Sequence, residues 1–146
     1  MDESETMMSE PTAHRPLVLV ADDEPAIRRL VSEVLDGAGF RTMTVADGAT
    51  VPALAARHRP DLIMLDIIMP GVDGYATAAH LQGDRATRDI PIVFVTAQDA
   101  PVYRTVGSGL GARAHLTKPF TAGQLAQVVR RVLGRPEGAA AAGATR

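Results

Sequence analysis

The amino-acid sequence predicts an α/β fold, a doubly wound five-stranded parallel sheet with five helices. Short aliphatic or β-branched runs alternate along the chain with segments of helical periodicity, which is typical of a parallel sheet with helices on both faces. Three of the runs are continuously apolar, as expected of strands that are buried on both faces. Right-handed crossovers between the strands then place helices on both sides of one sheet.

The expected strands are short and evenly distributed along the chain. They cover residues 17–20, 42–45, 62–65, 92–95 and 114–117. In a sheet of this kind, ligands bind beyond the carboxyl ends of the strands. The residues that directly follow each run are therefore the first candidates for a functional site.

Two helices have clear signals at their ends. The first follows Glu24, has Pro25 at its first position and ends at Gly37 or Gly39. The last opens with a capping box from Thr121 to Gln124. Each helix presents one apolar stripe to the sheet. The stripe consists of Ile27, Leu30, Val31, Val34 and Leu35 in the first helix and of Leu125, Val128, Val129 and Val132 in the last. Phe120 is expected to pack on Leu125 as a hydrophobic staple.

Three further helices are expected at about residues 50–58, 74–81 and 101–110, with Asp73 as the cap of the second of these. The helix at 101–110 should be short, because Gly107, Gly109 and Gly111 each cost about 1 kcal/mol relative to Ala inside a helix.

Composition limits the classes of function. The chain has 146 residues, a formal net charge of -2 and no cysteine. It therefore offers no basic surface for direct nucleic-acid binding and no thiolate metal site. The acidic start is unlike a signal peptide, and no apolar run reaches the ~20 residues of a membrane span. We expect a cytoplasmic protein that does not contact a membrane.

The chain divides into one folded unit and two ends. Residues 1–16 carry four acids without apolar periodicity and are expected to form a disordered acidic leader. Residues 17–133 form the domain, and residues 134–146 form a flexible Ala/Gly tail.

Charged and polar side chains collect after the expected strands: Asp22 and Asp23, Asp66, Thr96 and Lys118. Two unit charges ~4 Å apart repel by about 4 kcal/mol at an effective dielectric constant of ~20, so three carboxylates need a cation beyond one lysine. Oxygen ligands of this kind suit Mg²⁺. A carboxylate, Mg²⁺, a lysine and a threonine are what phosphoryl transfer to a carboxylate requires.

Four motifs resemble those of the response regulator receiver domains of two-component systems. They are Asp22-Asp23-Glu24, the segment from Leu65 to Gly74, Val95-Thr96-Ala97, and the segment from Leu116 to Phe120. The resemblance covers residues 17–133 and implies the strand order 2-1-3-4-5.

The resemblance also implies roles for individual residues. A histidine kinase, or a histidine phosphotransfer protein, would phosphorylate Asp66 with Mg²⁺, and the chain would catalyse only its own phosphorylation and dephosphorylation. The metal would be held by Asp22, Asp23, Asp66 and the carbonyl of Ile68, and the phosphoryl group would be bound by Thr96, Ala97 and Lys118. A switch made of Thr96 and residue 115 would change the face of the fourth helix, fifth strand and fifth helix that binds a protein target or output domain. The peptide bond before Pro119 would be cis.

The sequence departs from the family at the switch position, where His115 replaces the usual Tyr or Phe. Its coupling could be weaker, or depend on pH near the histidine pKa of ~6.5. Ile68 and Gln98 occupy positions that resemble those tuning dephosphorylation. The bulky apolar side chain of Ile68 should disfavour an attacking water, which predicts a long-lived phosphoryl state.

Other functions remain open. A phosphorelay intermediate is compatible with every residue, and so is a fragment of a longer regulator. A Mg²⁺-dependent phosphatase of the haloacid dehalogenase type also uses a strand-end Asp, a Thr and a Lys. It needs a second acid two residues after the nucleophile, where this chain has Ile68, so that alternative is weak.

Overall fold

The computed structural model describes residues 15–97 and 109–134. In chain order the elements are β1 (Leu17–Ala21), α2 (Pro25–Gly37), β2 (Arg41–Val45), α3 (Val51–His58), β3 (Leu62–Asp66), α4 (Gly74–Gln82), β4 (Ile92–Thr96), β5 (Ala112–Thr117) and α6 (Ala122–Val132). All five predicted strands and four of the five predicted helices are present in these residues. The helix expected at 101–110 lies almost entirely outside the described residues, as do most of the predicted leader and tail.

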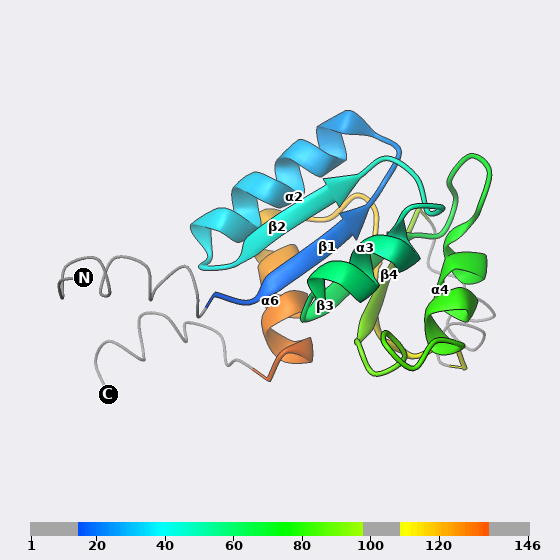
Figure 1. Cartoon of the computed structure of the whole chain (residues 1–146). Helices are drawn as coiled ribbons and strands as arrows, with labels where there is room; N and C mark the ends of the chain where they lie inside the picture. Colours follow the sequence, from blue (N-terminus) through cyan, green and yellow to red (C-terminus); the bar gives the residue numbers. More distant parts are fainter. Residues whose placement is uncertain (1–14, 98–108, 135–146) are drawn as a thin grey trace, which may run out of the picture.

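The strands form one parallel sheet in the order β2-β1-β3-β4-β5, which confirms the predicted order. Every residue of β1, β3 and β4 is buried, as their continuously apolar sequences predict. All strands point the same way, so their carboxyl ends meet at one edge of the sheet (Figure 1).

Each face of the sheet has its own hydrophobic core. One core joins alternate residues of the three central strands to α2 and α6, with Leu35 and Leu125 fully buried. The other joins the remaining strand residues to α3 and α4, with Leu81 and Phe94 buried. Alternation of side chains along each strand supplies both cores from the same strands. Helices therefore pack against both faces and leave the carboxyl edge accessible.

The helix ends follow the predicted signals. Asp73 caps α4, because its carboxylate accepts a hydrogen bond from the Ala76 amide at 2.8 Å. The capping box of α6 is complete, with Thr121 and Gln124 each accepting from the backbone amide of the other. These caps fix where the loops after β3 and β5 end.

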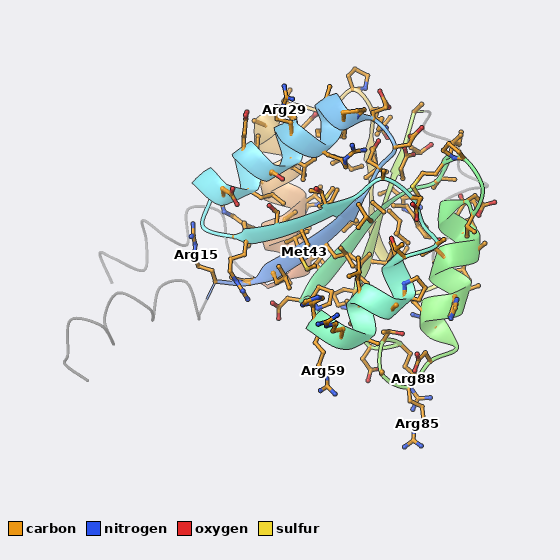
Figure 2. All side chains as sticks on the ribbon, turned by 45° about the horizontal axis from the view of Figure 1, so that its top comes forward. Arg15, Arg29, Met43, Arg59, Arg85 and Arg88 are labelled. Atoms are coloured by element: carbon orange, nitrogen blue, oxygen red, sulfur yellow. The ribbon has the colours of Figure 1, made fainter. Side chains whose placement is uncertain are left out.

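Arginines mark the edge of the sheet opposite to the carboxyl ends. Arg59 lies between α3 and β3, and Arg85 and Arg88 precede β4. Figure 2 shows these three side chains pointing outward from the lower part of the domain. Asp61, Asp84 and Asp89 lie in the same segments, so this end of the sheet carries charges of both signs.

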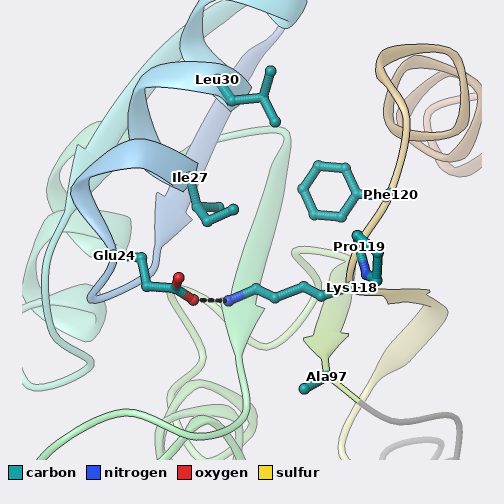
Figure 3. Close-up of a pocket in the computed structure, with 7 residues that line it drawn as sticks. All are labelled: Glu24, Ile27, Leu30, Ala97, Lys118, Pro119 and Phe120. Atoms are coloured by element: carbon teal, nitrogen blue, oxygen red, sulfur yellow. Dashed lines mark hydrogen bonds and ion pairs between the residues drawn. The ribbon is translucent and has the colours of Figure 1, made fainter.

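The predicted apolar stripe of α2 is wrong at one position. Leu30 is 36% exposed, whereas Val31 and Leu35 are buried. The five-residue stripe spans a wider arc of the helix than the sheet and α6 cover. Leu30 instead lines a hollow that it shares with Phe120 (Figure 3).

No helix among the described residues combines the length and the apolar composition needed to cross a membrane.

Candidate functional site

The carboxyl edge of the sheet brings together the side chains that the sequence places after the strands. Asp22 follows β1, Asp66 ends β3, Thr96 ends β4 and Lys118 follows β5. Asp22, Asp66 and Thr96 are almost completely buried, with 2%, 5% and 5% of their surfaces exposed. Buried polar side chains at one edge are costly unless they interact, so their grouping marks this edge as the candidate site.

Four acids form a cluster there. Ligand atoms of Asp22, Asp23, Glu24 and Asp66 all lie within 4.8 Å of one another. Asp22 and Asp66 are buried, while Asp23 and Glu24 are exposed. Mutual repulsion at this spacing favours a bound cation. The donors are all carboxylate oxygens, the chemistry that suits a hard cation with some water ligands retained.

Lys118 is the cation that the protein itself contributes. Its Nζ lies 2.8 Å from Glu24 Oε1, 3.0 Å from Asp22 Oδ2 and 3.2 Å from Asp66 Oδ2. Burial by itself would lower the pKa of Lys118, but its hydrogen bonds to Glu24 and Asp22 outweigh burial and raise the pKa. The amine therefore stays protonated.

The two carboxylate oxygens of Asp66 have different partners. Oδ1 accepts a hydrogen bond from the Ile68 amide at 3.2 Å, and Oδ2 accepts one from Lys118 Nζ at 3.2 Å. Burial, followed by the charge of Asp22, raises the pKa of Asp66, against the opposing effect of Lys118. The carboxylate is more basic than an exposed one and still has free lone pairs for an incoming group.

The loop after β3 is held against the strand by a close backbone approach at Gly74. The Gly74 amide donates to the Ile67 carbonyl at 2.9 Å. A Cβ at this position would lie 2.5 Å from the Asp66 carbonyl oxygen and 2.9 Å from Ile67 Cα. Only glycine fits here without moving the backbone of Asp66.

A hollow opens over the acids. It is lined by Asp23, Glu24, Asp66, Ile68, Ala97 and Lys118. The Ile68 side chain lines this hollow and is 71% exposed.

The Lys118–Pro119 peptide bond is cis, as the resemblance implies. The position of Gln98 lies outside the described residues.

His115 lies away from the acids, within β5. It pairs with Phe94 of β4, and the two rings are 5.8 Å apart between centroids. The side chain is half-buried.

Glu24 is the site residue that sequence reasoning missed. It appeared in the Asp22-Asp23-Glu24 motif without a role, yet it makes the shortest of the three contacts to Lys118. The signal was present in the sequence, because a third acid follows β1 at the edge where Lys118 also lies.

Comparisons with known proteins agree with this architecture. The sequence profile of the family described as "Response regulator receiver domain" matches residues 18–130, which confirms the resemblance seen in the motifs. The receiver fold is seen in the chemotaxis protein CheY4 of Vibrio cholerae, with TM-score 0.77, 32% identity and coverage of 81% of this chain and 98% of that one.

A further solved structure is the receiver domain of the sensor histidine kinase PA1611 from Pseudomonas aeruginosa. It has TM-score 0.75, 28% identity and coverage of 82% of this chain and 98% of that one. It is described as having a magnesium ion coordinated in the active site cleft.

Two curated relatives are longer than this chain. RpaA of Synechocystis, a DNA-binding dual master transcriptional regulator, is 40% identical over 122 residues, which are 84% of this chain and 51% of RpaA. The response regulator PleD of Caulobacter vibrioides is 43% identical over 103 residues, which are 70% of this chain and 23% of PleD. The chain thus spans about half or less of these relatives, so the DNA binding named for RpaA stays a property of that protein.

Proposed function

Because this chain belongs to the response regulator receiver domain family, we propose that it is a phosphoacceptor switch in which Asp66 accepts a phosphoryl group from a phosphohistidine. The observation that supports this most strongly is the position of the Asp66 carboxylate. It is buried in an acidic cluster and contacts Lys118 at 3.2 Å. A buried carboxylate beside a fixed ammonium is suited to form an acyl phosphate, because the ammonium offsets the negative charge of the phosphoryl group.

The transfer step is a substitution at phosphorus. An Asp66 carboxylate oxygen attacks, the new P–O bond forms, the P–N bond to the donor imidazole breaks, and its electron pair stays on that nitrogen. Lys118 stabilises the negative charge on the phosphoryl oxygens, and the Thr96 hydroxyl and the Ala97 amide would donate hydrogen bonds to the same oxygens. Asp22, Asp23, Asp66 and the Ile68 carbonyl would hold Mg²⁺, which neutralises charge on the transferring group.

The signal would leave through Thr96 and His115. Movement of the Thr96 hydroxyl towards the phosphoryl group would vacate space beside β4 and let the His115 side chain turn inward. This changes the surface around β5 and α6 that a target protein or output domain would bind. The upstream partner is a histidine kinase or a histidine phosphotransfer protein.

Acetyl phosphate, a small-molecule phosphoryl donor, tests the acceptor directly. Intact-mass measurement with Mg²⁺ should show one phosphoryl group per chain, and Asp66→Asn should take up none. Asp89→Asn removes an exposed carboxylate elsewhere and should behave as the unchanged protein does. Stoichiometric labelling of the Asp66→Asn variant, or labelling that is independent of Mg²⁺, would overturn the proposal.

A second assay, with a small phosphomonoester as the substrate, separates a switch from a phosphatase. A switch takes up one phosphoryl group and stops, whereas an enzyme of the haloacid dehalogenase type turns over a phosphomonoester continuously. Position 68 is apolar and exposed here, so no side chain at that position can supply the second proton transfer.

A further inference from the structure

The structure distinguishes three carboxylates around Lys118 by how firmly each is held. A lysine ammonium has three donors, and here each has one carboxylate partner: Glu24, Asp22 and Asp66. The Asp22 and Asp66 side chains are only 2% and 7% exposed, while that of Glu24 is 58% exposed. Glu24 therefore makes the shortest contact from the most accessible position.

The Glu24 side chain is not engaged with the backbone of its own helix. Glu24 is the N-cap residue of α2, a position at which the shorter side chains of Ser, Thr, Asp and Asn usually accept from the helix amides. Its side chain makes no such bond. It extends to Lys118 instead, across the hollow whose apolar wall is formed by Ile27, Leu30 and Phe120 (Figure 3).

Phosphorylation creates competition for the amine. If Asp66 carries a phosphoryl group, Lys118 exchanges its contact with the Asp66 oxygen for contacts with the phosphoryl oxygens, and to donate more than one hydrogen bond to them it must also give up Asp22 or Glu24. Asp22 is buried and its Oδ1 accepts a hydrogen bond from the Glu24 amide at 2.9 Å, so its carboxylate has no room to turn away from the amine. Glu24 can turn into solvent, where water replaces Lys118 at little cost.

We infer that Glu24 is a positioning residue that holds Lys118 in the resting state and releases it to the phosphoryl group on activation. This inference rests on the proposed function and assigns regulation to the same site. Glu24 thereby sets how readily the phosphorylated state forms and how long it persists, without itself contacting the phosphorus.

A Glu24→Gln substitution tests this, because Gln keeps the length of the side chain and removes its charge. The variant should bind beryllofluoride in the presence of Mg²⁺ more tightly than the unchanged protein does, on the order of two- to fivefold, the range expected for losing one exposed ion pair. Glu33→Gln is the matched control, since it removes one exposed charge from the same helix at a residue that is not part of the acidic cluster. Its affinity should not change.

A double-mutant cycle asks whether Glu24 acts through the amine. In a Lys118→Met background the effect of Glu24→Gln should disappear. An equal effect in both backgrounds would mean general charge repulsion and would overturn the inference. A tenfold or greater loss of affinity for Mg²⁺ alone, in both backgrounds, would make Glu24 a metal ligand and would also overturn it.

A spectroscopic measurement supports the cycle if the Lys118→Met variant binds too weakly or folds poorly. The NMR signals of the Lys118 side-chain amine, without metal or donor, should shift in Glu24→Gln and stay unchanged in Glu33→Gln. An unchanged Lys118 signal in Glu24→Gln would contradict the inference. Failure of the unchanged protein to bind beryllofluoride with Mg²⁺ would instead count against the proposed function.

Discussion

Replacing Gly74 with Ala should damage both the stability of the domain and its acceptor site. The added Cβ would meet the Asp66 carbonyl oxygen at 2.5 Å and Ile67 Cα at 2.9 Å. Both are backbone atoms at the end of a buried strand, so neither can move as a flexible side chain would. Overpacking of this kind costs about 1–3 kcal/mol, which exceeds the gain of at most about 1 kcal/mol from replacing Gly in a helix.

Gly37→Ala is the matched control. Gly37 ends α2, and a Cβ there meets no atom within 4 Å, so the variant should be unchanged or more stable by about 0.4–1 kcal/mol. Urea denaturation followed by circular dichroism should therefore separate the two variants by about 1 M in midpoint, for an m value near 2 kcal/mol per M.

The same substitution should also displace the acceptor. Relieving the contact at the Asp66 carbonyl needs a shift of several tenths of an ångström in the backbone that carries its carboxylate. Misplacement of about 1 Å can cost ~100-fold in rate, so labelling by acetyl phosphate should fall by about 10- to 100-fold. If Gly74→Ala is as stable as Gly37→Ala and is labelled at the original rate, the close approach at Gly74 does not constrain Asp66.

The remaining predictions concern the core, the rim and the charge of the site. Leu35→Ala should lower the free energy of unfolding by about 2–5 kcal/mol, and Leu30→Ala by less than about 1 kcal/mol, as thermal unfolding will show. Ile68→Ala should lose its phosphoryl group several times faster than Ile68→Leu, and equal rates in phosphate-release assays would contradict the shielding argument. Burial and the charge of Asp22 raise the pKa of Asp66 in the folded protein above its ordinary value of 3.8. Ionised Asp66 therefore lowers the free energy of unfolding at any pH above the raised pKa, and this loss of stability disappears as the pH falls towards 3.8. Without Mg²⁺, Asp66→Asn should therefore have a higher melting temperature than the unchanged protein at pH 7, and the difference should shrink at acid pH. Mg²⁺ at ten times its dissociation constant should raise the free energy of unfolding of the unchanged protein by about 1.4 kcal/mol.

Much of the fold follows from local sequence because the central strands are buried on both faces. An unbroken apolar run such as Leu62–Leu65 fits few other structures, and the capping box at Thr121 fixes the start of α6. Once the strands are parallel, the residues after them must share an edge. The meeting of Asp22, Asp66 and Lys118 is thus a consequence of topology.

Contacts that depend on side-chain packing could not be predicted in this way. The burial of Leu30 depends on how much of α2 the neighbouring helix covers. The hydrogen bond from the Thr77 hydroxyl to the Gly48 carbonyl joins α4 to the loop before α3, across 29 residues of sequence. The partner of Glu24 is separated from it by 94 residues, and its identity depends on side-chain rotamers that no local pattern specifies.

Burial also divides the site into parts that differ in their freedom to vary. Asp22 and Asp66 are buried, so a change at either alters a charge that solvent does not screen. Glu24 and Ile68 reach the same hollow from solvent-exposed positions, where a substitution changes a charge or a shape without creating a buried defect. We therefore expect the ability to accept a phosphoryl group to depend on the buried pair, and the rates of gain and loss to depend on the two exposed residues. Substituting Glu24 and Ile68 together should change the lifetime of the phosphoryl state and leave the urea midpoint of unfolding nearly constant.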